Sequence, residues 1–299
     1  MNPKVSNVIA TLDRIKKTSP VNVTVTGTIR FPDWVGLNDH IQGVAPLNNS
    51  SSATGCISGS STDGAYFATF EATSATAAVV RAVRIWPDRP QDYDHGSGVQ
   101  LLDGMLPFGV ESDRSSDKAE IGFYTLANLS APQRCYKFSM PGRKASATSI
   151  TNFTDGSVEK ALLASYEYDP KHMRFFLADY NQVAGTTNPW TETFLYTGGA
   201  FGGDEFQNFA MVTDTNNVIF MLGFREDEEL HLYEVVTEKN PFRILDIVRR
   251  KTYTGWSGAD WRNGVGAQIV DSSRIRIFGT DKDPSGSSTS YKFKVYVWS

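Results

Sequence analysis

The chain has 299 residues, 40% of them hydrophobic and 21% charged, and its formal net charge at pH 7 is −4. This composition is typical of a globular protein with enough apolar material for a large core. A slightly negative charge without a Lys/Arg stripe argues against nucleic-acid binding. No stretch reaches the roughly 18 apolar residues of a membrane helix, and the start lacks an apolar core of signal-peptide length. We therefore expect a soluble monomer without nucleic-acid or membrane partners, cytoplasmic as numbered or secreted with its leader removed.

Residues 1–20 are expected to form either a short helix outside the main domain or a disordered tail. Ser6 is a candidate helix cap. The apolar residues that follow it fall on one face of a helix: Val8, Ile9, Leu12 and Ile15. The next run, "VNVTVTGTIRF" at 21–31, alternates Val and Thr with the period of two that is typical of a β-strand.

One unit then recurs five times. Each copy is an apolar run, a turn rich in Asp, Asn, Ser or Gly, and a second apolar run, which predicts a β-hairpin. The aligned positions of the five copies are Val44, Val99, Ile150, Ala210 and Ala267. A third apolar run follows each hairpin, at 66–72, 119–126, 173–180, 230–236 and 291–298. A fourth run follows four of them, at 78–86, 133–140, 191–197 and 242–250.

The fifth unit lacks a fourth strand, and the run at 21–31 supplies one. Five complete four-stranded sheets are the pattern of a five-bladed β-propeller, an all-β fold closed here by the N-terminal strand in the last blade. Closure leaves no open blade edge. We expect residues 21–299 to form this single domain.

The innermost strands of such a fold line a central channel, and two of them begin alike, with "DHIQGVAPL" at 39–47 and "DHGSGVQLL" at 94–102. Because strand side chains alternate between faces, every second residue points inward. The inward positions are mostly polar and include His40, Gln42, His95, Ser97, Ser146, Thr148, Asn208 and Asn263. Three neighbouring glycines would let the backbones approach closely: Gly43, Gly98 and Gly266. The polar ring indicates either a water-filled channel or a ligand site.

The loops that lead into these strands carry a second polar group, expected around the channel mouth. Its charged members are Asp39, Asp94, Asp204, Glu205, Asp260 and Arg262. Its aromatic members are Trp34, Tyr93, Trp256 and Trp261. Convergent polar groups beside aromatic side chains are typical of a ligand site. We expect ligand contacts from Arg262, Trp256 and Trp261 together with His40, Gln42, His95, Ser97, Thr148, Asn208 and Asn263.

The repeat pattern over 21–299 resembles the five-bladed propellers of the arabinanase, xylosidase and invertase group of glycosidases. It also resembles bacterial propeller proteins of unassigned function that carry "HxQG" and "HGSGVQ" stretches. The first resemblance implies glycoside hydrolysis by three carboxylates at the channel mouth, here Asp39, Asp94 and Glu205. Glu205 is the expected acid, because Phe201 and Phe206 would desolvate it. The local motifs around that group's carboxylates are not recognisable here.

Metal and redox chemistry have few candidates. Cys56 and Cys135 lack metal-ligand spacing, and we expect two buried thiols. His40 and His95 could share one divalent cation in the channel with a neighbouring aspartate, Asp39 or Asp94, or else form a hydrogen-bonded structural pair.

The other two histidines, His172 and His231, fall in outer hairpins, where we expect them at the surface.

The sequence thus predicts a propeller that binds a small polar ligand, a saccharide or a metabolite, at one site at the channel mouth. A glycoside hydrolase is the first alternative. A protein-interaction platform is the second, which an exposed aromatic rim would favour and buried tryptophans would disfavour.

Overall fold

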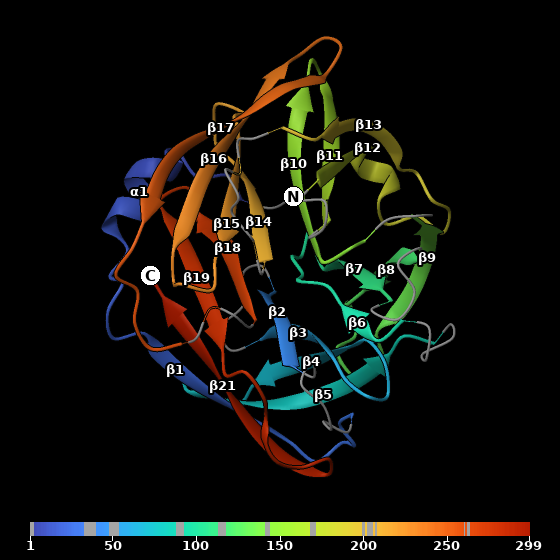
Figure 1. Ribbon diagram of the computed structural model, residues 1–299, viewed down its shortest axis with the longest axis vertical. Helices are drawn as coiled ribbons and strands as arrows, with labels where there is room; N and C mark the ends of the chain where they lie inside the picture. The colour runs from blue at the N-terminus through green and yellow to red at the C-terminus, as the bar shows by residue number, and fades with distance from the viewer. Residues whose placement is uncertain are drawn as a thin grey trace.

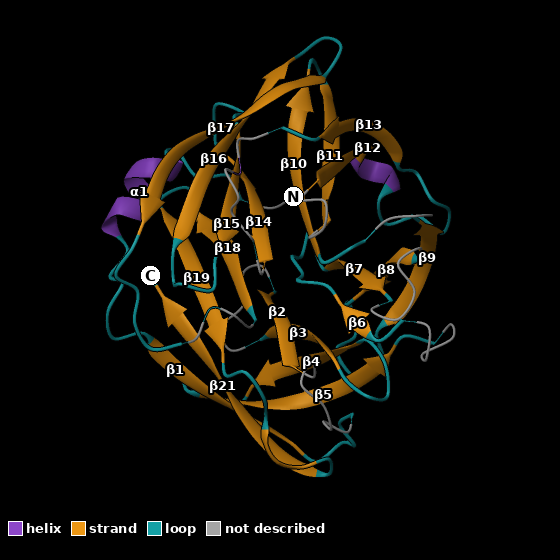
Figure 2. Ribbon diagram, viewed as in Figure 1, coloured by secondary structure: helices purple, strands orange, loops and turns teal. Residues whose placement is uncertain are grey.

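The computed structural model describes residues 3–32, 40–47, 54–87, 93–112, 118–140, 144–167, 172–198, 201, 206, 208–259, 261 and 264–299. Within these residues the chain is nearly all β, with one α-helix, α1 (Val8–Arg14), and one 3₁₀ turn, η1 (Tyr180–Gln182). The sheets surround a common centre, with strands β2, β6, β10, β14 and β18 innermost (Figures 1 and 2). None of the described helices is long and apolar enough to cross a membrane.

Three sheets of the described chain have four antiparallel strands each. The first contains β6 (His95–Gly96), β7 (Met105–Glu111), β8 (Ala119–Thr125) and β9 (Gln133–Ser139). The second contains β10 (Ala147–Asp155), β11 (Val158–Glu167), β12 (His172–Asp179) and β13 (Thr191–Tyr196). The third contains β14 (Asn208–Thr213), β15 (Ile219–Phe224), β16 (Leu230–Glu238) and β17 (Arg243–Tyr253).

The fourth sheet has nine strands and contains both ends of the β structure. Their order is β1 (Val21–Gly27), β5 (Ala77–Ile85), β4 (Tyr66–Ala72), β3 (Gly55–Ser60), β2 (His40–Pro46), β18 (Val265–Asp271), β19 (Arg274–Thr280), β21 (Ser290–Trp298) and β20 (Ser285–Ser287). It joins two four-stranded antiparallel runs, β2 to β5 and β18-β19-β21-β1. The two runs meet at their inner edges in one pair, Val265 with Gly43.

Strand β1 confirms the predicted closure of the chain. It pairs antiparallel with β21 in seven consecutive residue pairs, from Val21–Val297 to Gly27–Tyr291. It also pairs in parallel with β5, at Thr24–Ala77 and the two pairs after it. The sequence did not predict this second pairing, which closes eight strands into a ring. It satisfies backbone groups that an open outer edge would leave unpaired.

The predicted third and fourth strands lie within three residues of the observed ones at every boundary. Among the inner strands, β6 is much shorter than the others and covers only His95 and Gly96. The chain beyond it forms isolated bridges at Gly98 and Leu102 and then turns at Asp103, which has a φ of 48°. In this unit the inner segment therefore has two strand residues and isolated bridges in place of the longer inner strand of the other units.

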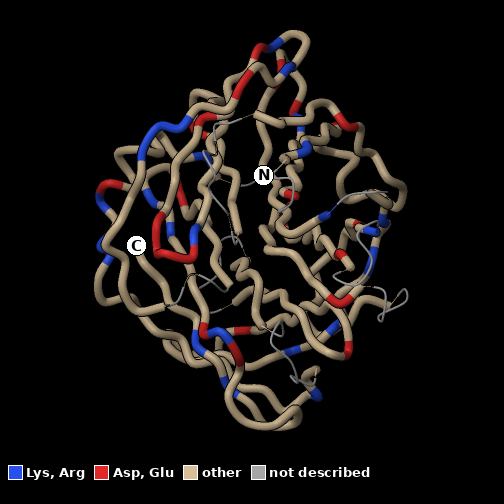
Figure 3. Tube along the Cα trace, viewed as in Figure 1, with Lys and Arg blue, Asp and Glu red and all other residues tan. Residues whose placement is uncertain are grey.

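The hydrophobic core lies between neighbouring sheets. One buried cluster joins the β14–β17 sheet to β18, β19 and β21, and includes Leu222, Ile277 and Trp298. Similar clusters join each other pair of neighbours around the ring. Because each sheet is buried on both faces by its neighbours, the arrangement is that of a β-propeller. Lys and Arg are interspersed with Asp and Glu along the described trace (Figure 3).

The N-terminal helix packs against this core differently from the prediction. Its N-cap is Asn7, whose side chain accepts a hydrogen bond from the Ala10 N–H at 2.9 Å, in place of Ser6. Val8 and Leu12 are buried as expected, but Ile9 is 37% exposed. The buried face instead continues back to Val5, because positions 5, 8, 12 and 15 follow the helical period more closely than position 9 does.

Two expectations about outer residues were wrong. His231 is fully buried on β16, where its Nε2 lies 2.8 Å from Glu229 Oε2 and the Arg249 guanidinium contacts the ring. These polar partners allow an imidazole to sit at an inward-facing position of the strand. Cys56 is buried, but Cys135 is only partly so, and both are free thiols.

Candidate functional site

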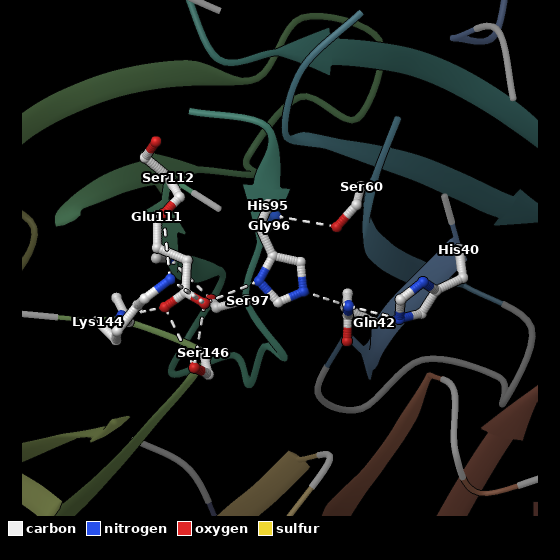
Figure 4. Close-up of polar contacts among 12 residues, drawn as sticks. His40, Gln42, Ser60, His95, Gly96, Ser97, Glu111, Ser112, Lys144 and Ser146 are labelled. Carbon is white, nitrogen blue, oxygen red and sulfur yellow. Dashed lines mark hydrogen bonds and ion pairs between the residues drawn. The ribbon is translucent and has the colours of Figure 1, made fainter. Parts of the chain in front are cut away.

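The starts of the inner strands bring three predicted ligand-binding residues together (Figure 4). Gln42 Nε2 lies 2.6 Å from His40 Nε2 and 2.5 Å from His95 Nε2. The two imidazole rings are 6.3 Å apart between centroids. A side-chain amide nitrogen carries two hydrogens, one for each ring, so that both Nε2 atoms act as acceptors. His40, Gln42 and His95 therefore form one connected polar group.

A break in strand register aims Gln42 at the two imidazoles. In the pairing of β2 with β3, Ile41 is opposite Gly59 and Gly43 is opposite Ser58, so Gln42 has no partner across the ladder. An unpaired bulge residue bends its strand and redirects its own side chain. His40 and Gln42 thus converge on His95, which comes from the neighbouring inner strand β6.

Glu111 supports His95 from behind, and sequence reasoning missed it. It lies directly opposite His95 in the β6–β7 pairing, and its Oε1 is 2.9 Å from His95 Nδ1. Directly paired residues of an antiparallel ladder place their side chains on one face. The available signal was an acidic residue in the apolar run "MLPFGVE", but recognising it required the register of β7 against a two-residue strand.

The buried Glu111 carboxylate is ionised. Its Oε2 accepts a hydrogen bond from the Ala145 N–H at 2.6 Å, and the Ser146 hydroxyl donates to it at 3.1 Å. Lys144 Nζ lies 4.0 Å from Oε1. Burial raises the pKa of Glu111, but the neighbouring donors, His95 first among them, outweigh burial and hold the pKa below its ordinary value. An ionised carboxylate only accepts, so His95 Nδ1 carries a proton and donates it in this hydrogen bond.

Three other predicted ligand-binding residues lie deeper and are fully buried: Ser97, Thr148 and Asn208. The Ser97 hydroxyl accepts a hydrogen bond from the Gly109 N–H at 2.9 Å and contacts Thr148 Oγ1 at 3.2 Å. Asn208 Nδ2 donates to the Val265 carbonyl of the next inner strand. These side chains therefore tie inner strands to one another beneath the His40–Gln42–His95 group.

The glycines confirm that the inner strands converge closely. A Cβ at Gly98 would lie 2.1 Å from Asn208 Oδ1, and one at Gly43 would lie 2.6 Å from the Val99 nitrogen. A Cβ at Gly266 would lie 2.0 Å from a β2 carbonyl oxygen. At Gly43 and Gly266 the close atoms belong to the backbone, which explains glycine there, whereas a side chain at Gly98 would require Asn208 to shift.

The predicted catalytic carboxylates are only partly within the described chain. Asp94 is half-buried and directly precedes His95. Asp39 and Glu205 lie outside the described residues, as do Arg262 and Asn263. The aromatic neighbours of Glu205 are described, with Phe201 and Phe206 in the core between two sheets.

The two predicted ligand-contacting tryptophans are not beside the imidazoles. Trp256 and Trp261 are 4% and 0% exposed, with ring centroids 5.0 Å apart. Both stack edge-on against Trp298 in the core cluster between β14–β17 and β18–β21. The structure places them in the packing between sheets.

The described residues offer little to a metal ion. Among them no group of three or more His, Cys, Asp or Glu is close enough to hold one. The Nε2 atoms of His40 and His95 already contact Gln42, and His95 Nδ1 contacts Glu111. A cation shared by these two imidazoles would have to displace the Gln42 amide, so the metal site stays a prediction.

Comparison with known proteins gives similarity of fold. No protein-family model matches the chain, and no curated protein sequence matches it. An α-L-arabinanase from Penicillium chrysogenum, solved with arabinobiose, matches with a TM-score of 0.50 and 11% identity, over 93% of this chain and 98% of the arabinanase. A β-xylosidase/α-arabinofuranosidase from a compost metagenome gives 0.49 and 11%, over 95% and 94%. The chain therefore shares a propeller fold with the arabinanase.

Proposed function

We propose that the chain is a five-bladed propeller that binds a small polar ligand, a saccharide or similar polyhydroxylated metabolite, where His40, Gln42 and His95 meet. The blade count follows if the nine-stranded sheet is taken as two blades in edge contact. One blade is then β2 to β5, and the other is β18, β19, β21 and β1.

The observation that supports binding is a row of hydrogen-bonded side chains, Glu111, His95, Gln42 and His40, that is buried at the Glu111 end and accessible at the other. The Glu111 side chain is 4% exposed, whereas that of His95 is 17% exposed, and His40 at the other end is half-buried. Packing alone gains little from four linked polar side chains, because apolar residues of similar volume stabilise a fold as well or better. Side chains held in place in advance lose little entropy when a ligand binds. Imidazole and amide groups also match the paired donors and acceptors of sugar hydroxyls.

Titration with a panel of neutral mono- and oligosaccharides, followed by NMR or calorimetry, tests this proposal. The variant His95→Ala removes the centre of the polar group and should weaken binding at least tenfold. His172→Ala is the matched control, because His172 is also a part-exposed histidine near a carboxylate, 3.8 Å from Glu167, but lies on β12. Equal affinity of wild type and His95→Ala, or no binding of any saccharide to wild type, would contradict the proposal.

A glycoside hydrolase that uses Asp39, Asp94 and Glu205 is the second candidate, supported by the fold shared with the arabinanase. Glu111 is a poor acid for this chemistry, because its lowered pKa keeps it ionised. The reaction would therefore depend on the three loop carboxylates. A screen of aryl glycosides against wild type and Glu205→Gln separates the two candidates: turnover lost in the variant supports hydrolysis, and unchanged ligand binding without turnover supports a binding protein.

A protein-interaction platform has the least support. That function was expected to use exposed aromatic residues, and both described tryptophans of the predicted rim, Trp256 and Trp261, are buried.

A further inference from the structure

The end of the channel opposite the His40–Gln42–His95 group contains a small, partly open cavity. It has a volume of about 20 Å³ and is lined by residues late in the inner segments, among them Pro46, Gln100, Thr151, Met211 and Gln268. Pro3 and Lys4 from the start of the chain complete its wall. A volume of this size holds one water molecule.

Residues 3–6, the N-terminal segment, are tied across this end of the channel. Val5 is fully buried and forms an isolated parallel bridge with Asp214 after β14. On the other side, the Ser6 N–H donates to the Ser272 carbonyl after β18 at 2.8 Å. Figure 1 marks the N-terminus near the centre of the ring and α1 at its outer edge. The segment therefore spans two neighbouring inner strands and covers the opening between them.

Two inner segments approach each other closely between the cavity and the candidate site. Gly98 lies so near Asn208 that a Cβ there would be 2.1 Å from Asn208 Oδ1. These two residues belong to different inner strands and come before the cavity-lining Gln100 and Met211 in the chain. Their close approach lies between the cavity and the polar group along these two segments.

Gln268, one of the residues that line the cavity, has a buried polar atom without a partner. Gln268 is 5% exposed, and its Nε2 donates to the Leu47 carbonyl at 2.8 Å, but its Oε1 accepts no hydrogen bond. Gln100, which lines the same cavity, differs, since its Oε1 accepts from the Met211 N–H and its Nε2 donates to the Met211 carbonyl. A buried carbonyl oxygen without a donor destabilises the fold, and a water molecule that donates to it removes this cost.

A second partner for a water molecule is present. Thr151 and Thr213 also line the cavity, and their hydroxyl oxygens lie 2.9 Å apart. Only one of them donates in this contact, so the other has a hydrogen to offer. A water molecule here would accept from a threonine and donate to Gln268 Oε1, as buried waters with two or more polar partners do.

We propose that residues 3–6 seal the far end of the channel over one buried water molecule, which donates a hydrogen bond to Gln268 Oε1. The channel is then closed at this end and does not pass through the molecule. Any ligand of the His40–Gln42–His95 group enters and leaves on the same face.

A high-resolution crystal structure and oxygen-17 relaxation dispersion test the water. We expect density within hydrogen-bond distance of Gln268 Oε1, and one long-lived water fewer in Gln268→Met than in wild type. Thr151→Val is the matched control, because Thr213 keeps a hydroxyl to donate. It should leave the number of long-lived water molecules unchanged. A dry cavity in wild type, or an unchanged count in Gln268→Met, overturns the water site.

Deletion of residues 1–6 tests the seal. The water should remain at Gln268 Oε1 in the crystal but exchange rapidly, so that its long-lived relaxation signal is lost. A signal that persists in the folded deletion variant shows that the segment is not the seal. Should the deletion prevent folding, the double variant Pro3→Gly with Lys4→Gly gives the same measurement, since it keeps the Val5 bridge and removes both wall side chains.

Discussion

Replacing Glu111 by glutamine tests whether this carboxylate holds the candidate site together. Three donors face its two oxygens: the His95 ring at 2.9 Å, the Ala145 N–H at 2.6 Å and the Ser146 hydroxyl at 3.1 Å. In Glu111→Gln one oxygen becomes an NH₂ group, so at least one buried donor meets another donor. A hydrogen bond to a charged group contributes about 1.5–3 kcal/mol, and a buried donor left without a partner costs about 1–3 kcal/mol. We expect the free energy of unfolding to fall by about 2–4 kcal/mol.

Urea unfolding at pH 7, followed by tryptophan fluorescence, measures this loss as a lower midpoint with an unchanged slope. Glu120→Gln is the matched control. Glu120 is also a buried carboxylate, on β8, but its partner Lys137, 2.9 Å away, has a side chain that is 34% exposed. Such a solvent-open pair contributes about 0–1 kcal/mol. If Glu111→Gln costs no more than Glu120→Gln, the described network does not stabilise the site.

The same variant carries a prediction about pH. The folded-state pKa of Glu111 lies below its ordinary value of 4.5, with burial opposing the shift and the His95 contact and the other donors causing it. A carboxyl whose pKa is lowered by folding stabilises the protein above its unfolded-state pKa, and this contribution is lost as pH falls through the folded-state pKa. The difference in stability between wild type and Glu111→Gln should therefore be full at pH 6 to 7 and shrink below about pH 4.5. A difference that grows on acidification would refute the assignment of an ionised Glu111.

Two further changes test the ring. Deleting residues 1–31 removes β1 as well as α1, whereas deleting residues 1–18 removes α1 and leaves β1. The longer deletion should lower the melting temperature far more, because it alone opens the closed sheet. Equal melting temperatures in calorimetry would contradict the closing role of β1. Gly98→Ala should destabilise the fold by about 1–3 kcal/mol through overpacking against Asn208, and Asn208→Ala in the same chain should recover part of that loss in a double-mutant cycle. Strictly additive effects would show that the two residues do not meet.

The sequence by itself determined the repeat, the positions of the strands other than β6, and the closure by the N-terminal strand. Each depends on local information, because alternation with a period of two marks a strand wherever it lies. The same alternation placed His40, Gln42 and His95 on one inward side of adjacent strands, and glycines such as Gly98 marked where the strands would meet.

Tertiary structure alone decided which groups face one another. Glu111 lies behind His95 because of the register between β6 and β7, and a bulge turns Gln42 between the two imidazoles. Trp256 is buried in the core, although the polar residues of its loop predicted a ligand site at the channel mouth. Residues 3–6 cross the far end of the channel by pairing with segments more than 200 positions away. Periodicity specifies the face on which a side chain lies, but its partner depends on how distant strands align, and that alignment is set by packing summed over the whole ring.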